Sequence, residues 1–266
     1  MVQVLAPNAS AQAETFPAYA LDMSADADVA QVAGLIGEPA RAAVLMALID
    51  GRALAASTLA QEAGVARSTI SEHLGRLTDA GLVSVQASGR HRYYRLASGE
   101  VAEALETLAR LAPPTPIRSL RQATRAHALR RARSCYDHLA GRLGVALTDA
   151  LLARGDLVAE RASSSATDPI LGAGRAHAFH LTDAGARRLA EMGVEVSPRG
   201  RRPLVRYCVD WSEQRPHLGG ALGAALFETL LERDWIRRGS GRAVLPTEAG
   251  RTALVEQLGV SAAVFD

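Results

Sequence analysis

Apolar residues in the first part of the chain recur at the spacing of helices that bury one face. The pattern predicts four helices, over residues 27–36, 39–50, 58–63 and 67–80. Gly37 ends the first helix, and Pro39 fits the first turn of the second. In the fourth helix, Ile70, Leu74 and Leu77 share one face, which we expect to lie in the core.

Alternating polar and apolar residues follow the fourth helix. They predict a β-hairpin with strands over 82–86 and 91–96, and Gly89 suits its turn. A further amphipathic helix is expected over 100–111. Because prolines lack a backbone donor and forbid helix continuation, the domain should end at the proline cluster of Pro113, Pro114 and Pro116.

The length of 266 residues favours more than one domain. Mean hydropathy is +0.03, and no apolar run approaches the roughly 20 residues of a membrane span. The start of the chain lacks a basic and apolar secretion signal, so we expect a cytoplasmic protein without a membrane partner. The predicted segments are a flexible arm (1–25), a first domain (26–112), a basic helical linker (113–134) and two C-terminal units (135–198 and 199–266).

Charge is distributed unevenly along the chain, although the net charge is only +2. Residues 1–112 contain 8 arginines and 12 acidic residues. Within this acidic domain, the stretch 67–95 carries five arginines against Glu72 and Asp79 alone. A local excess of cations on the fourth helix and the hairpin is typical of a surface that binds phosphates.

The outward face of the fourth helix combines short hydroxyl side chains with arginine. Ser and Thr permit close approach to a DNA groove, and Arg can bind guanine O6 and N7. An ordinary solvated helix face is the alternative, but the preceding turn, the hairpin and the local charge favour double-stranded DNA as the partner. The candidate DNA contacts are Arg67, Ser68, Thr69, Ser71, Glu72, His73 and Arg76 on the helix and Arg90, His91, Arg92 and Tyr93 on the hairpin.

The order of three helices, a turn, a helix, a hairpin and a helix is that of a winged helix-turn-helix. The sequence resembles the ArsR/SmtB family of bacterial transcription regulators over about 85 residues. The resemblance is carried by GEPAR (37–41), LAQEAGV (59–65), STISEHL (68–74), AGLV (80–83) and GRHRYYRL (89–96). It implies a DNA-binding regulator that acts as a homodimer on a pseudo-palindromic operator.

Three features depart from that family or qualify the resemblance. Metal-sensing members use paired cysteines on the third helix or Asp and His residues on the last, but 58–63 has no cysteine and 100–111 has no histidine. Ala66 replaces the usual hydroxyl cap of the fourth helix, at a cost of about 1 kcal/mol. Glu72 would be repelled by phosphate, although it could accept a hydrogen bond from cytosine N4.

The second half of the chain is an internal repeat, in which residues 135–194 match 208–260. Cys-Tyr-Asp at 135–137 corresponds to Cys-Val-Asp at 208–210, and His138 corresponds to His217. Each copy is expected to form a helix, a turn, a hairpin with glycine at its tip and a closing helix. The predicted fold is therefore mainly α with small β-hairpin wings (α+β), a winged helix-turn-helix followed by a duplicated winged-helix-like half. The expected hairpin tips hold Gly172 and Gly174 in the first copy and Gly239 and Gly241 in the second.

The repeated Cys-x-Asp and His residues leave three interpretations open. Two thiols and two imidazoles are a ligand set that zinc accepts, so Cys135, His138, Cys208 and His217 are candidate metal ligands. A pocket for a small organic effector, with the two aspartates orienting the histidines and aromatic residues as walls, is preferred to the metal and stands level with a purely structural role. Packed core residues are the third interpretation. The candidate effector residues are Cys135, Tyr136, Asp137, His138, Tyr207, Cys208, Asp210, Trp211 and His217.

The predicted function is a dimeric repressor that an effector in the C-terminal half releases from DNA. No cofactor and no enzymatic activity are expected, and the less favoured alternative is an enzyme that uses one of the two cysteines as a nucleophile. The arginine-rich linker could lie along DNA, bind the acidic first domain or be solvated; its arginines are 118, 121, 125, 130, 131 and 133. Gly141, Gly144, Gly220 and Gly223 should mark points of close helix approach. Candidate dimer contacts are Val29, Val32, Ile36, Leu105 and Leu108.

Overall fold

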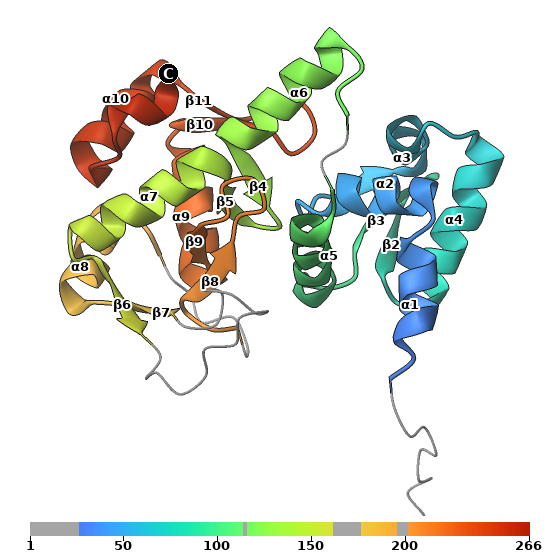
Figure 1. The fold of residues 1–266 in the computed structure, drawn as a ribbon, viewed down its shortest axis with the longest axis horizontal. Coiled ribbons are helices and arrows are strands. Elements are labelled where there is room, and N and C mark those ends of the chain that lie inside the picture. Colours follow the sequence, from blue (N-terminus) through green and yellow to red (C-terminus); the bar gives the residue numbers. More distant parts are fainter. Residues whose placement is uncertain (1–26, 114–115, 162–176, 196–201) are drawn as a thin grey trace, which may run out of the picture.

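The computed structural model describes residues 27–113, 116–161, 177–195 and 202–266 (Figure 1). The predicted arm over 1–25 and the first predicted hairpin tip, with Gly172 and Gly174, lie outside these residues. Figure 1 shows a first domain built from α1–α5 and β1–β3 beside a C-terminal half built from the later elements. Helices and short antiparallel strands alternate in both parts.

The first domain is the predicted winged helix-turn-helix. Its helices are α1 (Val29–Ile36), α2 (Pro39–Leu48), α3 (Ala56–Ala63), α4 (Arg67–Asp79) and α5 (Gly99–Leu111). Its strands are β1 (Leu54–Ala55), β2 (Val83–Ser88) and β3 (His91–Leu96), in the sheet order β1-β3-β2. Strand β1 was not predicted, because two residues are too few to show an alternating pattern.

Local chemistry fixes the ends of these helices. The Glu38 carboxylate accepts hydrogen bonds from the backbone N–H groups of Ala40 and Arg41, which begins α2. Gly64 ends α3 in the left-handed conformation (φ 67°), where a side chain would be strained. Ala66 gives α4 no side-chain cap, as its sequence predicted. The α3–α4 turn is thus set by Gly64 rather than by a capping hydroxyl.

Core positions on α4 follow the predicted face, since Ile70, Leu74 and Leu77 are at most 1% exposed. Leu105 is also buried in this core, so its predicted role as a surface dimer contact is wrong. By contrast, Val29 is 71% exposed, and no residue of α1 is buried. The first part of α1 therefore presents exposed apolar residues, while Leu35 and Ile36 at its end pack partly against the core.

The same order of elements occurs twice in the C-terminal half after α6 (Leu120–Arg131). The first set is β4 (Arg133–Cys135), β5 (His138–Ala140), α7 (Gly141–Ala153), β6 (Leu157–Arg161), β7 (His177–Leu181) and α8 (Asp183–Glu191). The second set is β8 (Arg206–Val209), β9 (Pro216–Gly219), α9 (Gly220–Glu232), β10 (Ile236–Arg238), β11 (Val244–Pro246) and α10 (Glu248–Leu258), followed by the 3-10 turn Ala262–Phe265. Each set begins with a hairpin rather than with the predicted helix.

The two sets share one hydrophobic core and pack reciprocally. Helix α7 packs on strand β9 of the other set, and α9 packs on β5. Glycines also let each helix pack on its own hairpin: a Cβ at Gly144 would lie 2.4 Å from the Leu139 carbonyl oxygen, and one at Gly223 would lie 2.6 Å from that of Leu218. A Cβ at Gly223 would in addition lie 3.3 Å from the Cβ of His138 in the other set. At Gly144 and Gly223 the predicted close approach is therefore between a helix and a hairpin, whereas a Cβ at Gly141 would lie 2.9 Å from the Arg130 carbonyl oxygen at the end of α6.

Polar contacts join the first domain to the C-terminal half. The buried Glu106 on α5 pairs with the buried Arg242 at 2.7 Å, and Arg125 on α6 pairs with Glu62 on α3 at 2.9 Å. The latter agrees with the interpretation that the linker helix binds the acidic first domain. No single described helix is long and apolar enough to cross a membrane; α1 and α2 reach that length only together, bent by 87°.

Candidate nucleic-acid interface and Cys–His cluster

Helix α4, the recognition helix, presents a polar face to solvent. Burial of Ile70, Leu74 and Leu77 on one side turns the intervening side chains outward. The exposed candidates on this face are Arg67, Ser68, Thr69, Ser71, Glu72 and Arg76. Six of the seven helical candidates therefore share one accessible surface.

His73 is the one predicted helical contact that does not lie on this exposed surface. Its side chain is only 14% exposed, and its Nε2 atom lies 3.8 Å from the Glu38 carboxylate at the start of α2. The position sits at the edge of the buried stripe, so the imidazole packs against α2 instead of facing outward. His73 is therefore a structural neighbour of Glu38 rather than a member of the exposed face.

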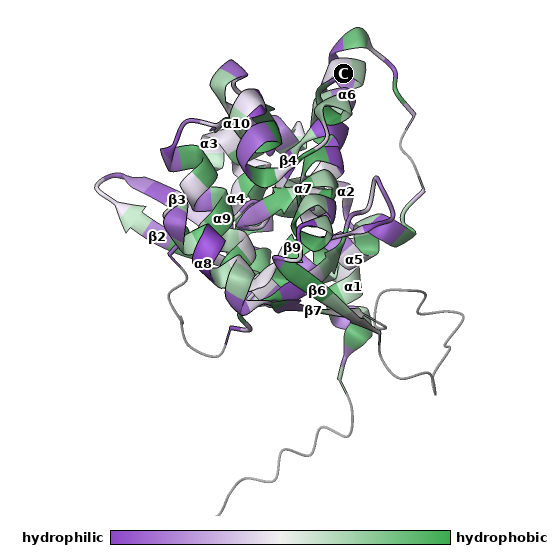
Figure 2. Ribbon diagram, turned by 90° about the vertical axis from the view of Figure 1, so that its left-hand side faces the viewer, coloured by the Kyte–Doolittle hydropathy of each residue, from purple (hydrophilic) through white to green (hydrophobic). Residues whose placement is uncertain are grey.

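The hairpin β2–β3, the wing, projects from the body of the molecule beside the recognition helix (Figure 2). Strand alternation buries Tyr94 (8% exposed) and leaves Tyr93 at the surface (36%). One tyrosine therefore packs in the core, while the candidate contact Tyr93 stays accessible. Arg90, His91 and Arg92 at the tip are all exposed.

A groove of about 480 Å³ separates the recognition helix from the wing. Its lining includes Ser71 and Gly75 from α4 and Arg90 and Arg92 from the wing. On the helix, Arg76 donates a hydrogen bond at 2.7 Å to Glu72, which lies one turn earlier. The negative charge of Glu72 is therefore paired with an arginine and does not face DNA phosphate uncompensated. The surface offers hydroxyls at its centre and cations along its wing side, which suits an anionic polymer.

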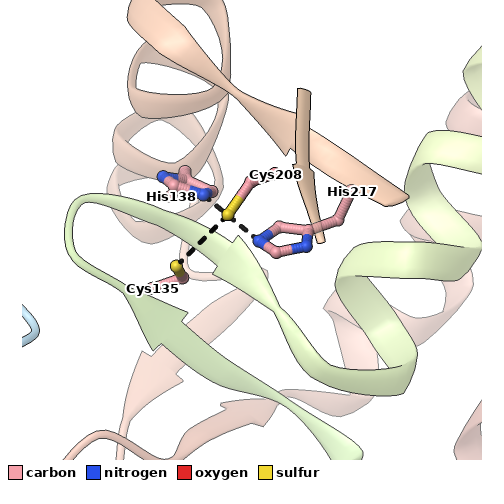
Figure 3. Close-up of side chains that lie close together, drawn as sticks. All are labelled: Cys135, His138, Cys208 and His217. Carbon is pink, nitrogen blue, oxygen red and sulfur yellow. Dashed lines mark hydrogen bonds between the residues drawn. The ribbon is translucent and has the colours of Figure 1, made fainter. Parts of the chain in front are cut away.

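A second site joins the two repeats. Cys135 and His138 are directly opposed across β4–β5, and Cys208 and His217 are opposed across β8–β9. The four side chains, here called the Cys–His cluster, point toward one another (Figure 3). Their donor atoms all lie within 4.8 Å of one another, with 3.8 Å between the two sulfurs and 3.2 Å between the two Nε2 atoms.

The two aspartates of the repeat have different partners, against the prediction that each orients a histidine. Asp137 Oδ1 lies 3.3 Å from His138 Nδ1, as expected. Although burial alone would raise it, hydrogen bonds from Arg202 and His138 lower the pKa of the Asp137 carboxyl to about 2. Asp210 instead pairs with the fully buried Arg133 at 2.8 Å and accepts from backbone N–H groups.

Arg133 and Trp211 also differ from their predicted places. Arg133, assigned to the cationic linker face, is 0% exposed, and its guanidinium lies 4.5 Å from the centre of the Trp211 ring. The aromatic ring and Asp210 together compensate the buried charge. The half-buried Trp211 therefore stacks on the buried Arg133.

A cavity of about 690 Å³ lies between α5 of the first domain and the two Cys-bearing hairpins. Six of the nine predicted effector residues line it, whereas Asp210, Trp211 and His217 do not. The lining from the C-terminal half includes Cys135, Tyr136, Asp137, His138, Tyr207 and Cys208. Sequence reasoning missed the contribution of α5, whose Glu103, Glu106 and Arg110 form the opposite wall.

The environment of Cys135 opposes its use as a nucleophile. A hydrogen bond with Cys208 and burial raise the pKa of the Cys135 thiol well above its usual range. Reactive cysteines need the pKa to be lowered, because the thiolate is the attacking species. The site thus gives no support to the thiol-enzyme alternative.

The fold and its exposed basic face define a winged helix-turn-helix DNA-binding protein. Residues 36–86 match the helix-turn-helix domain family. YdfF of Bacillus subtilis (strain 168), an uncharacterized HTH-type transcriptional regulator, is 36% identical over 236 residues, covering 88% of this chain and 98% of YdfF. The chain therefore belongs to the HTH-type transcriptional regulators, which confirms the predicted class of DNA-binding regulator.

Other relatives match the first domain alone. The HTH-type transcriptional regulator CmtR of Mycobacterium tuberculosis is 36% identical over 80 residues, which are 30% of this chain and 67% of CmtR. The solved structure of reduced HlyU from Vibrio cholerae is 27% identical, with a TM-score of 0.30, and covers 32% of this chain and 88% of HlyU.

Proposed function

We propose that this regulator is a homodimeric repressor whose recognition helix and wing bind a pseudo-palindromic operator. The carrying observation is the continuous exposed surface of α4 and the wing, with hydroxyls over the helix and arginines at the tip. Arg76 is proposed to contact bases, and Arg90 and Arg92 are proposed to contact phosphates. A protein that occupies promoter DNA in this way blocks transcription by exclusion.

Helix α1 supports the dimer. Val29 and Val32 are 71% and 42% exposed, and Leu108 on α5 is 46% exposed. Burial of such apolar residues between two copies would remove them from water and bring two recognition helices onto one face of the duplex. Two half-sites about one helical turn apart are the expected operator.

The C-terminal half is proposed to be the sensor. Its cavity is shared with α5, so that a ligand there contacts both the repeats and the DNA-binding domain. The repeats themselves are proposed to be duplicated winged modules, since each carries a helix, a hairpin and a closing helix begun by a threonine cap, Thr182 or Thr247. Ligand binding would shift the population toward one arrangement of the two halves.

Titration of DNA from upstream of the chain's own gene, by fluorescence anisotropy, tests the DNA-binding surface. Arg76→Ala and Arg90→Ala should weaken binding, and Arg90→Ala should reduce the salt slope by about 1 because a phosphate contact is lost. Arg237→Ala is the matched control, since this arginine is exposed but lies on β10 of the C-terminal half. The assignment fails if both variants bind like the wild type over the salt range.

A further inference from the structure

From the geometry of the Cys–His cluster we infer that the C-terminal half binds one thiophilic divalent metal ion, of which zinc is the type, through Cys135, His138, Cys208 and His217. The inference names the ligand of the proposed sensor and so rests on the proposed function for its regulatory meaning. Its metal chemistry stands on the cluster alone. None of the elements that carry these residues belongs to the helix-turn-helix domain.

The distances match a tetrahedral ion. With Zn–S near 2.3 Å and Zn–N near 2.0–2.1 Å, tetrahedral geometry separates two sulfurs by about 3.8 Å and two nitrogens by about 3.3–3.4 Å. The structure has 3.8 Å between the Cys135 and Cys208 sulfurs and 3.2 Å between the Nε2 atoms of His138 and His217. The sulfur–nitrogen pairs, at no more than 4.8 Å, need to close by at most about 1.3 Å, which side-chain rotation supplies.

The repeat explains how four ligands meet at one point. Each hairpin contributes one cysteine and the histidine directly opposite it, so each hairpin is a two-ligand arm. Strands β5 and β9 lie against each other, and the reciprocal packing of α7 and α9 holds the arms in place. Gly219 makes room for this meeting, because a Cβ there would lie 3.2 Å from His138 Nε2.

A metal ion satisfies these groups better than they satisfy one another. Cys135, His138 and His217 are buried. Cys135 shares only a thiol–thiol hydrogen bond with Cys208. His138 and His217 share one hydrogen bond between their Nε2 atoms, in which only one ring can donate. Asp137 beside His138 Nδ1 is the carboxylate partner that zinc-bound histidines typically have. Cys135, His138 and Cys208 line the 690 Å³ cavity, which gives the ion a path of entry.

A disulfide between Cys135 and Cys208 is the competing use of the two thiols. It would account for the sulfur pair but not for two imidazole nitrogens converging on the same point. The four-residue geometry therefore favours the metal, and the disulfide becomes an outcome of the test.

The turn between two of the ligands touches the DNA-binding domain. Tyr136, between Cys135 and His138, has the left-handed conformation (φ 56°) that a side chain rarely adopts. Its ring packs against Gly51 and Gly99, where a Cβ would lie 3.4 and 3.5 Å from ring carbons. A metal that fixes Cys135 and His138 thus fixes Tyr136 against the segments that follow α2 and begin α5.

Cobalt(II) titration of the chelator-treated full-length protein, kept reduced, tests the site. We expect one Co²⁺ per chain, with the intense visible absorption of tetrahedral cobalt and a sulfur-to-metal charge-transfer band, and displacement of cobalt by Zn²⁺. Cys208→Ser and His217→Gln should abolish the tetrahedral spectrum. His127→Ala, which removes an exposed histidine of α6, is the matched control and should leave it intact.

If a variant fails to fold, zinc-dependent thermal stabilisation of the wild type takes its place, because only an ion that binds the native state raises the unfolding temperature. Weak octahedral cobalt spectra in the wild type, or no zinc-dependent stabilisation, would overturn the proposal. So would a native Cys135–Cys208 disulfide in protein that takes up no metal. These measurements use no DNA, so metal uptake without operator binding refutes the proposed function alone, and operator binding without metal uptake refutes this inference alone.

Discussion

The buried ion pair between α5 and the C-terminal half yields a prediction about how firmly the two parts are joined. Glu106 and Arg242 are 6% and 8% exposed, and their charged atoms lie 2.7 Å apart. Removing one partner of a buried pair leaves the other charge uncompensated and costs about 3–5 kcal/mol. We expect Glu106→Gln to lower the free energy of unfolding by this amount, or the unfolding temperature by roughly 6–20 °C.

The same helix offers a matched control. Glu103, also on α5, pairs with Arg206 of the C-terminal half, but these side chains are 52% and 44% exposed. A pair in water contributes at most about 1 kcal/mol, so Glu103→Gln should be nearly neutral. The Glu103–Arg206 and Glu106–Arg242 pairs have the same charges and start from the same helix, so they differ mainly in how deeply they are buried.

Urea denaturation followed by circular dichroism measures both variants. The double variant Glu106→Leu/Arg242→Met should recover much of the loss, because an apolar pair of similar volume leaves no buried charge. Equal losses for Glu103→Gln and Glu106→Gln, or a loss below about 1 kcal/mol for Glu106→Gln, would refute the reasoning.

Further predictions concern zinc affinity, the dimer and two glycines. Asp137→Asn should weaken zinc binding by about 10–100-fold, as measured by competition with a chromophoric chelator, since it alters the partner of His138 Nδ1; unchanged affinity would contradict it. Val29→Glu should convert dimer to monomer in sedimentation, because it places a charge on the exposed apolar helix; a persistent dimer would place the interface elsewhere. Gly250→Ala should destabilise the protein by at least about 1–3 kcal/mol, since its Cβ would lie 1.8 Å from the Trp235 carbonyl oxygen. Gly75→Ala, with open space around it, should stabilise α4 by about 0.5–1 kcal/mol in the same denaturation assay, and a shared sign would refute the argument.

The first domain was predictable because its signals are local. The spacing of Ile70, Leu74 and Leu77 sets the orientation of α4, and strand alternation separates Tyr93 from Tyr94. His73 could not be placed in this way, because its position at the edge of the buried stripe is decided by Glu38, on another element. Helical periodicity orients a face, but contacts from a neighbouring helix decide its edges.

The hairpins β4–β5 and β8–β9 were not predictable from local pattern. Their strands have only three or four residues, and the β4–β5 turn uses Tyr136 at φ 56° where a turn signal would be glycine or asparagine. The repeat did predict which residues correspond, and hence that the two Cys–His pairs could meet. Whether Asp210 would serve His217 or Arg133 depended on tertiary packing that buries Arg133, which no spacing in the sequence encodes.

Operator affinity measured with and without zinc determines whether metal in the C-terminal half controls DNA binding by the first domain. The full-length protein, freed of metal by a chelator, would be titrated against fluorescent upstream DNA, and the titration repeated with one equivalent of Zn²⁺ and with Cys208→Ser. We predict that zinc weakens wild-type binding by about 5–150-fold, the usual range of coupling between two sites, and leaves Cys208→Ser unchanged. Equal or tighter wild-type binding in the zinc-loaded state would contradict the account.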